Sequence, residues 1–288
     1  KWEGLRAGDN CVSTLTLGYP KNVSVVYMTF DELKARFENK LNMPISLKNP
    51  YKLCDFKPTY GVVFDDYIKE FDFWGYCDTD LIFGNIRRFL TEDILQRCDK
   101  VLTRGHLSLW RNCRRMNEFF KEETDEFYKI VFSSDDQYAF DEYGSYGIAH
   151  RLKEKLEPER FYDEIPYDDL YILKGSFVSS QRGARNMKNA VYCFSDGELV
   201  RYFIDDRGEL GKEYVLYVHM QKRDMVFKDV SFDSREFIIT PPNRFEKLKV
   251  VSKENLYKIG VAPLFYSQYF KIRGRNLRRK LFKILRRR

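Results

Sequence analysis

The chain has 288 residues, of which 43% are hydrophobic and 16% aromatic, and its formal net charge at pH 7 is +7. This length and apolar content predict a globular, enzyme-sized unit. The segment Lys271–Arg288 carries ten Lys and Arg residues and no Asp or Glu, so the rest of the chain has 40 basic and 43 acidic side chains. Because that remainder is slightly acidic, a general nucleic-acid-binding surface is disfavoured, and we predict no nucleic-acid partner.

Six cysteines are scattered along the chain without a CxxC pair. A chain of this size does not need disulfide staples, so they indicate reduced, mostly buried thiols in a cytoplasmic protein. Residues 1–10 lack the apolar stretch of a signal peptide, and no run approaches the ~20 apolar residues that span a bilayer. The sequence therefore predicts neither secretion nor a transmembrane anchor.

The first half of the chain alternates predicted strands and helices. Val23–Thr29 favours a strand, and Thr29 followed by Asp31 and Glu32 predicts the N-terminus of a helix that ends at Leu41. Residues 49–58 and 60–70 are expected to be helical, and a strand follows at Phe71–Cys77. Beyond it we predict a helix at 86–95, strands at 100–103 and 106–110, an amphipathic helix at 114–128, and a turn from 135 leading into a helix that ends at 155.

The second half is richer in short strands. Val191–Phe194, Leu199–Phe203 and Tyr214–His219 are β-rich runs separated by Asp/Gly turns such as Ser195–Gly197. No repeat or low-complexity linker interrupts the sequence. The simplest organisation is one α/β domain over residues 1–269, with a mixed sheet flanked by helices, followed by a basic tail over residues 270–288.

Two carboxylates directly after an apolar strand form the sharpest local feature. Phe73–Cys77 runs into Asp78-Thr-Asp80, and a turn at Gly84 follows. In an open α/β sheet, ligands gather where strands end, and carboxylate oxygens suit Mg²⁺ or Mn²⁺ bridging a diphosphate. An Asp-x-Asp triplet alone is weak support, because acidic pairs at strand ends are commonly solvated turns or caps.

Three blocks together resemble a bacterial family found in polysaccharide-biosynthesis gene clusters. They are Asn49-Pro-Tyr-Lys-Leu-Cys-Asp-Phe-Lys-Pro58, Phe73-Trp-Gly-Tyr-Cys-Asp-Thr-Asp80 and Thr103-Arg-Gly-His-Leu-Ser-Leu-Trp-Arg-Asn112. That family is similar to the GT-A glycosyltransferases, including the glycogenin-like and lipopolysaccharide galactosyltransferase groups. The resemblance covers Pro20–Met225, and the combination of blocks is more specific than any one of them.

The resemblance implies a GT-A-like (Rossmann-like) fold and a hexosyltransferase activity. The donor would be a nucleotide-sugar, taken as a UDP-hexose such as UDP-galactose, and the acceptor a surface polysaccharide or a lipid-linked glycan. The runner-up is a non-catalytic protein with a degenerate GT-A fold that binds nucleotide-sugars or carbohydrates.

In such enzymes, the resemblance implies, a DxD pair and a later His hold a divalent cation, Mn²⁺ or Mg²⁺, on the donor diphosphate. The matching positions are Asp78, Asp80 and His219. Lys222 and Arg223 follow His219 and place two cations where a phosphate needs neutralising. On spacing alone, a surface His beside a basic turn is the alternative.

The resemblance also places Lys52 and Asp55 on the segment that flanks the donor site. Their i, i+3 spacing puts them on one helical face, where a base can support the diphosphate and an acid can meet a sugar hydroxyl. An ordinary ion pair on a helix surface explains the same spacing and contributes little to stability.

The segment Ser134–Gly144 is similar to the acidic acceptor-side segment of GT-A enzymes. Asp141 or Glu142 is the candidate to orient the acceptor hydroxyl, or to accept its proton if the reaction inverts. Asp135, by contrast, can serve simply as a helix N-cap.

Both ends of the chain depart from a plain GT-A pattern. Lys1–Tyr19 is short and polar, and shows no clear first strand, so no residue is assigned to the nucleotide base. At the other end, Leu277, Leu281 and Ile284 can share one side of a helix starting near Arg275, among ten cations. Such a basic amphipathic tail predicts binding to an anionic membrane surface, peripheral at the inner face of the plasma membrane; a disordered tail or a helix docking on a protein are the alternatives.

Overall fold

The computed structural model describes residues 2–7, 21–122, 126–142, 147–181, 188–231, 233–264, 266–267, 269–274 and 277–278, with backbone only for residues 2–7. The chain divides into two compact units, each built from two separate stretches. Unit 1 comprises Lys1–Cys77 and Asp93–Asp163, and unit 2 comprises Asp78–Glu92 and Glu164–Arg288. The chain therefore passes from one unit to the other three times. None of the three crossings is a linker that the composition could reveal.

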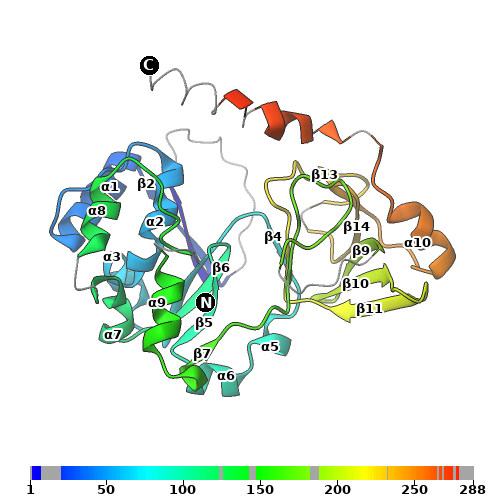
Figure 1. The fold of residues 1–288 in the computed structure, drawn as a ribbon. Coiled ribbons are helices and arrows are strands. Elements are labelled where there is room, and N and C mark those ends of the chain that lie inside the picture. The colour runs from blue at the N-terminus through cyan, green and yellow to red at the C-terminus, as the bar shows by residue number, and fades with distance from the viewer. Residues whose placement is uncertain are drawn as a thin grey trace. The chain divides into compact units, whose positions relative to one another are not determined.

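Unit 1 is mixed α/β (Figure 1). Its strands form a parallel pair, β1-β2, and a four-stranded sheet in the order β3-β6-β5-β7. The strands are β1 Trp2–Ala7, β2 Val23–Met28, β3 Phe73–Cys77, β5 Lys100–Arg104, β6 Leu107–Arg111 and β7 Phe161–Tyr162. The helices are α1 Phe30–Leu41, α2 Leu53–Phe56, α3 Tyr60–Val63, α4 Asp65–Ile68, α6 Glu92–Arg97, α7 Arg114–Asn117, α8 Phe127–Ser133 and α9 Ile148–Lys155.

Local sequence signals account for the first helix and for the central strands. Thr29 caps α1 in a capping box with Glu32, as the sequence predicted. On the sheet, Trp74 of β3 lies directly opposite Trp110 of β6, and their rings stack with centroids 5.4 Å apart. Both indoles are buried in one core cluster, to which α1 contributes Phe37. Aromatic pairs of this kind add to the stability gained from burial alone.

Two predicted helices are broken into shorter pieces. Residues 49–70 form α2, α3 and α4 with 3-10 turns at Pro50–Lys52 and Lys57–Thr59, because a proline stands at the first position of one turn and the second of the other. The helix predicted at 114–128 ends at Asn117, since Glu118 takes φ −97° and ψ 3°, and a 3-10 turn follows it. The apolar periodicity of this segment correctly predicted which side chains are buried, namely Met116, Phe119 and Phe120, but it did not predict the break in the helix.

Unit 2 contains a three-stranded sheet, β4-β12-β8, and a six-stranded sheet, β11-β10-β9-β14-β15-β13. Its strands are β4 Leu81–Phe83, β8 Asp168–Asp169, β9 Lys188–Ser195, β10 Glu198–Ile204, β11 Leu210–Tyr214, β12 Tyr217–His219, β13 Val226–Phe227, β14 Glu236–Thr240 and β15 Arg244–Glu246. Its helices are α5 Ile86–Phe89 and α10 Lys253–Ile259, and α10 packs on β9 and β10 (Figure 1). Together the units confirm a mixed α/β protein with several sheets.

The hairpin between β9 and β10 follows its turn chemistry. Asp196 and Gly197 both have positive φ, 49° and 80°, which a two-residue hairpin turn requires, and Ser195 pairs with Glu198 across it. This confirms the predicted Ser195–Gly197 turn. The strand predicted at Tyr214–His219, however, is wrong as a single element: β11 ends at Tyr214 and β12 begins at Tyr217, in another sheet. The sequence does not indicate the break at Val215 and Leu216, because the run is continuously apolar there.

The chain ends also differ from expectation. Trp2–Ala7 is a strand paired parallel to β2, in a stretch where the sequence showed no clear strand. Its six residues do not alternate between apolar and polar, so the sequence has no strand signal there. The strand is defined by its backbone pairing with β2. The helix predicted near Arg275 lies mostly outside the described residues. Within the described part of the chain, no helix is long and apolar enough to cross a membrane. The five cysteines described there are free thiols, with Cys98 and Cys193 buried and Cys77 exposed.

Candidate metal centre

The three-stranded sheet of unit 2 gathers three acidic or imidazole side chains from distant parts of the chain. Strand β12 is its centre, antiparallel to β4 and parallel to β8, so His219 lies opposite Leu81 on one side and Asp169 on the other. Asp80 directly precedes β4, and its carbonyl oxygen accepts a hydrogen bond from the Met220 N–H at 2.9 Å. The pairing thus fixes Asp80, His219 and Asp169 side by side.

Asp78, Asp80 and His219 present ligand atoms that lie within 4.8 Å of one another. His219 Nε2 is 3.2 Å from Asp80 Oδ1 and 4.0 Å from Asp78 Oδ2. The His219 side chain is 9% exposed, Asp80 is 21% exposed and Asp78 is 38% exposed. The cluster is therefore buried on the His side and open to solvent on the Asp78 side.

These separations fit a small divalent cation. Octahedral Mg²⁺ with ligands at about 2.1 Å places adjacent ligands about 3 Å apart and opposite ligands about 4.2 Å apart. The 3.2 Å from His219 Nε2 to Asp80 Oδ1 is close to the separation of adjacent ligands, and the 4.0 Å to Asp78 Oδ2 is close to that of opposite ligands. Two carboxylates and one imidazole form an oxygen-rich donor set with one nitrogen, which suits Mn²⁺ at least as well as Mg²⁺.

Asp169 orients the imidazole from behind. Its Oδ1 lies 2.9 Å from His219 Nδ1, which leaves Nε2 directed toward Asp78 and Asp80 when Nδ1 carries the proton. Asp169 is itself held by Ser180 Oγ and by the side-chain amides of Gln181 and Gln221. A carboxylate that buttresses the far nitrogen of a ligating His is the usual second layer of a metal site.

Three carboxylates, those of Asp78, Asp80 and Asp169, surround the His219 imidazole. Burial acts to lower the pKa of His219, but hydrogen bonds to Asp169 and Asp80 outweigh it and raise that pKa to about 9. The imidazole is therefore protonated at neutral pH, and a cation at Nε2 would take the place of that proton. Burial opposes ionisation of Asp80, yet the His219 hydrogen bond and the Lys222 N–H lower the Asp80 pKa below its ordinary value. The carboxylate is thus kept ionised, the form that a cation requires.

The chain leaves β12 through a strained turn that serves the cluster. Gln221 and Lys222 both adopt left-handed backbone conformations, with φ of 52° and 58°, and the Arg223 N–H closes the turn on the Met220 carbonyl at 3.2 Å. For side chains larger than Gly this costs about 1 kcal/mol or more per residue. The turn aims the Lys222 N–H at Asp80 Oδ2, 2.7 Å away, and the Gln221 amide at Asp169. Both contacts stabilise the strained conformation.

The two cations after His219 have different surroundings. The Lys222 side chain is exposed beside the cluster. Arg223 is 4% exposed and donates to the carbonyl oxygens of Pro242, Tyr171 and Lys174 and to the Tyr266 hydroxyl. Arg223 therefore ties loops of unit 2 together, and Lys222 is the better placed of the two to meet a phosphate.

Lys52 and Asp55 lie in unit 1 as a buried pair, each 1% exposed, with Nζ and Oδ2 2.8 Å apart. Lys52 also donates to the carbonyl oxygens of Val131 and Asp136, and Asp55 accepts from the N–H groups of Tyr138 and Phe140. The pair is thus neither on a helix surface nor open to a ligand in this conformation. It fastens α2 to the segment that follows α8.

Asp141 and Glu142 also lie in unit 1, next to Gly105. Asp141 is 4% exposed and its Oδ2 is 3.3 Å from Lys57 Nζ, while Glu142 is exposed. Burial raises the pKa of Asp141 to about 7, with Lys57 opposing the shift. A Cβ at position 105 would lie 2.6 Å from Glu142 Oε1 and 2.7 Å from Asp141 Oδ2, so a larger residue there would displace these two carboxylates.

The structure thus brings together Asp78, Asp80, His219 and Lys222 of the predicted site residues. Lys52, Asp55, Asp141 and Glu142 belong to unit 1 and form their own networks. Sequence reasoning missed Asp169 and Gln221. The acidic doublet Asp168-Asp169 before apolar Leu170 is a signal of the same kind as the Asp-x-Asp, but nothing local says which of the two acids faces His219.

A family model described as a family of unknown function (DUF6625) matches residues 9–249, so the chain belongs to that family. No curated protein and no solved structure matches the chain.

Proposed function

We propose that this member of a family of unknown function is a metal-dependent hexosyltransferase with a GT-A-like fold. The donor is a UDP-hexose, with UDP-galactose as the first candidate, and the acceptor is a surface polysaccharide or a lipid-linked glycan. The observation that carries the proposal is the convergence of Asp78, Asp80 and His219, with Asp169 behind the imidazole. The sugar, the acceptor and the GT-A assignment rest on the family resemblance of the three sequence blocks.

Each side chain of the cluster has a role in this proposal. Asp78, Asp80 and His219 hold Mn²⁺ or Mg²⁺, and Asp169 keeps the His219 Nε2 lone pair directed at it. When bound, the cation supplies positive charge to the leaving diphosphate. The Lys222 ammonium adds to that charge, and the Lys222 N–H holds Asp80 in place. Asp141 or Glu142 serving the acceptor hydroxyl stays a prediction.

The runner-up, a non-catalytic protein that binds nucleotide-sugars or carbohydrates, loses its main support. It drew on the apparent lack of a first strand, and β1 is present. Metal-dependent hydrolysis of UDP-galactose by the purified chain is expected of the transferase and not of a binding protein.

Calorimetric titration of UDP in the presence and absence of Mn²⁺ tests the metal centre. The parental chain is expected to bind UDP more tightly with Mn²⁺, and Asp80→Ala is expected to lose that enhancement while unfolding at the same temperature. Asp206→Ala, which removes an exposed carboxylate from a turn of the same unit, is the matched control and should bind as the parent does. Metal-dependent UDP affinity that is unchanged in Asp80→Ala contradicts the proposal.

The location proposed for the enzyme is the cytoplasmic face of the plasma membrane, through the basic tail. Part of that tail is described: Lys271, Arg273 and Arg278 are exposed, and so are the apolar side chains of Phe270 and Leu277, at 57% and 59%. Exposed apolar groups among cations are suited to an anionic headgroup layer, which offers a partner to both.

A further inference from the structure

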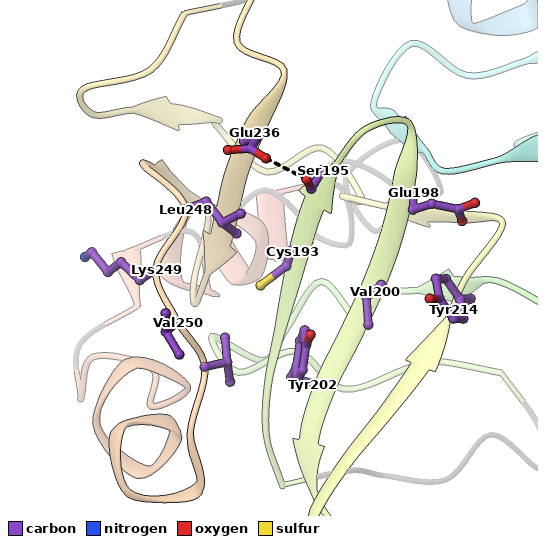
Figure 2. A pocket seen from close by; sticks show the side chains of 11 residues that line it. Cys193, Ser195, Glu198, Val200, Tyr202, Tyr214, Glu236, Leu248, Lys249 and Val250 are labelled. Carbon is purple, nitrogen blue, oxygen red and sulfur yellow. Dashed lines mark hydrogen bonds between the residues drawn. The ribbon is translucent and has the colours of Figure 1, made fainter.

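A cavity of about 550 Å³ opens on one face of the six-stranded sheet of unit 2, whereas His219 of the candidate metal centre belongs to the three-stranded sheet (Figure 2). The opposite face of this sheet packs into the core through Tyr192, Leu199 and Ile239. On the cavity face, α10 covers one end, where Leu256 packs against Val191 and Ile238. Residues 248–251 also line the cavity.

Strand register arranges the cavity lining in two rows. Ser195 of β9 pairs with Glu198 of β10 and with Glu236 of β14, which gives a row of three oxygen-bearing side chains across the sheet. Two residues further along, Val200 pairs with Tyr214 of β11, and Tyr202 follows on the same face. Figure 2 shows the Ser195–Glu236 hydrogen bond in the first row and the two tyrosines beyond Val200. The lining is thus polar on one side and aromatic on the other.

Two of the charged side chains that line the cavity, Glu198 and Lys249, already have counterions. Arg88 donates to Glu198 through Nε and Nη2, both at 3.1 Å, and its guanidinium lies 4.0 Å from the centre of the Tyr214 ring. Lys249 pairs with Glu246 at 2.7 Å. Glu236 accepts from Ser195 Oγ at 2.7 Å. A phosphate or an acidic sugar would therefore meet carboxylates and compensated cations, which disfavours an anionic ligand.

The carboxylates of the wall keep some capacity to accept hydrogen bonds. An ionised carboxylate has about four lone-pair sites. Glu198 already accepts from Asn85 and twice from Arg88, and Glu236 accepts from Ser195, so each can accept at least one more. Tyr214 is 45% exposed and Tyr202 is partly exposed, which gives two ring surfaces next to those acceptors. A neutral sugar offers the complement of both, since its hydroxyls donate and its C–H face packs on aromatic rings.

We propose that this cavity binds a neutral oligosaccharide, with its hydroxyls on Glu198 and Glu236 and a ring face on Tyr202 or Tyr214. The site is separate from the metal centre, so it does not require the cation or the nucleotide. That the oligosaccharide is a stretch of the growing acceptor glycan rests on the proposed function; that it is a neutral sugar rests on the cavity alone.

Saturation-transfer NMR on the full chain tests this site, with EDTA present so that the metal centre is not loaded. The probes are maltotriose, cellotriose and β-1,4-linked galactotriose, with trigalacturonate as the anionic comparison. At least one neutral trisaccharide is expected to receive saturation, and trigalacturonate is expected to receive none. Transfer to trigalacturonate alone, or to none of the four probes, overturns the proposal.

Variants locate the binding. Tyr214→Ala and Glu236→Gln should each weaken the titrated affinity about tenfold, as expected for losing one ring contact or one charged acceptor. Both change exposed side chains, so the fold should survive, and Glu236→Gln keeps the side-chain volume. Tyr171→Ala removes a tyrosine of similar exposure, 41%, outside the cavity and should bind as the parent does.

The result is independent of the proposed enzyme activity. Asp80→Ala should keep trisaccharide binding while losing Mn²⁺-dependent UDP binding. Trisaccharide binding that is lost in Asp80→Ala, or unchanged in both cavity variants, assigns the sugar to another site and overturns the proposal. Trisaccharide binding without any metal-dependent UDP binding leaves the cavity assigned and contradicts the transferase.

Discussion

The two units use the same kinds of charged side chain for different ends. In unit 1, Lys52 and Asp55 are 1% exposed, and the hydrogen bonds described for their side chains all stay within the same unit. In unit 2, Asp78, Asp80 and His219 converge on one point at a solvent-facing edge. Buried charges that pair with one another hold a fold together, whereas two carboxylates and an imidazole that converge at a partly exposed edge form a donor set that suits a cation.

The contrast has a local version at two adjacent residues. Lys222 is exposed and Arg223 is buried, although both are cations in the same turn. Arg223 uses its fork of donors on backbone carbonyls, as buried guanidinium groups commonly do. Burial therefore distinguishes these two neighbouring cations: Arg223 is held inside unit 2, and the Lys222 side chain faces solvent.

The largest effect is expected from breaking the buried pair of unit 1. Asp55→Ala leaves the Lys52 ammonium buried without its carboxylate, which should lower the free energy of unfolding by about 3–5 kcal/mol in a urea titration. Asp135→Ala, which removes an exposed partner of Lys48, should cost less than about 1 kcal/mol. Equal losses in the two variants would show that the buried network does not stabilise unit 1.

The adjacent cations should respond in opposite ways. Arg223→Met removes the buried guanidinium that donates to three backbone carbonyls and to the Tyr266 hydroxyl, so it should lower the free energy of unfolding by about 2–4 kcal/mol. Lys222→Met should leave stability nearly unchanged but lower hexose transfer about 100-fold, because it removes charge near the leaving diphosphate. Full activity in Lys222→Met would remove this residue from the proposed mechanism.

The acceptor-side prediction concerns unit 1. If Glu142 or Asp141 meets the acceptor hydroxyl, Glu142→Gln or Asp141→Asn should slow transfer to acceptor about 100-fold. Donor hydrolysis and UDP affinity, measured in parallel, should stay at the parental values. An equal loss of UDP affinity would place the segment on the donor side instead.

Asp169 sharpens the comparison within unit 2, because it is a buried carboxylate that acts through another residue. Asp169→Asn should weaken Mn²⁺ binding about 10- to 100-fold in calorimetry. A merely structural role would not alter the imidazole tautomer, so the nitrogen NMR shifts of His219 are the second readout. Asp206→Asn is the control, and an unchanged tautomer in Asp169→Asn would contradict the positioning role.

The smallest effect is expected at the tail, where each cation near an anionic surface contributes at most ~1 kcal/mol before screening. The full chain should sediment with vesicles that contain phosphatidylglycerol and not with vesicles of phosphatidylcholine alone. A chain truncated after Tyr269 should lose this binding. Equal sedimentation of the two chains would remove the tail from the proposed membrane contact.

The sequence alone determined the features that depend on near neighbours in the chain. Thr29 and Glu32 predicted the start of α1, Asp196-Gly197 predicted the hairpin turn, and the apolar run to Cys77 predicted a strand that delivers Asp78 and Asp80. Dihedral preferences, caps and side-chain periodicity act within a few residues, so they can be read without the fold.

Tertiary structure alone decided which charges share a site. Asp80, Asp169 and His219 are 50 or more residues apart in sequence, and they meet only because β12 pairs with both β4 and β8. The i, i+3 spacing of Lys52 and Asp55 predicted that they share one helical face. It could not predict that residues near 131–140 bury them. Burial and long-range pairing depend on contacts between distant segments, and those contacts set whether a charged residue stabilises the fold or faces a ligand.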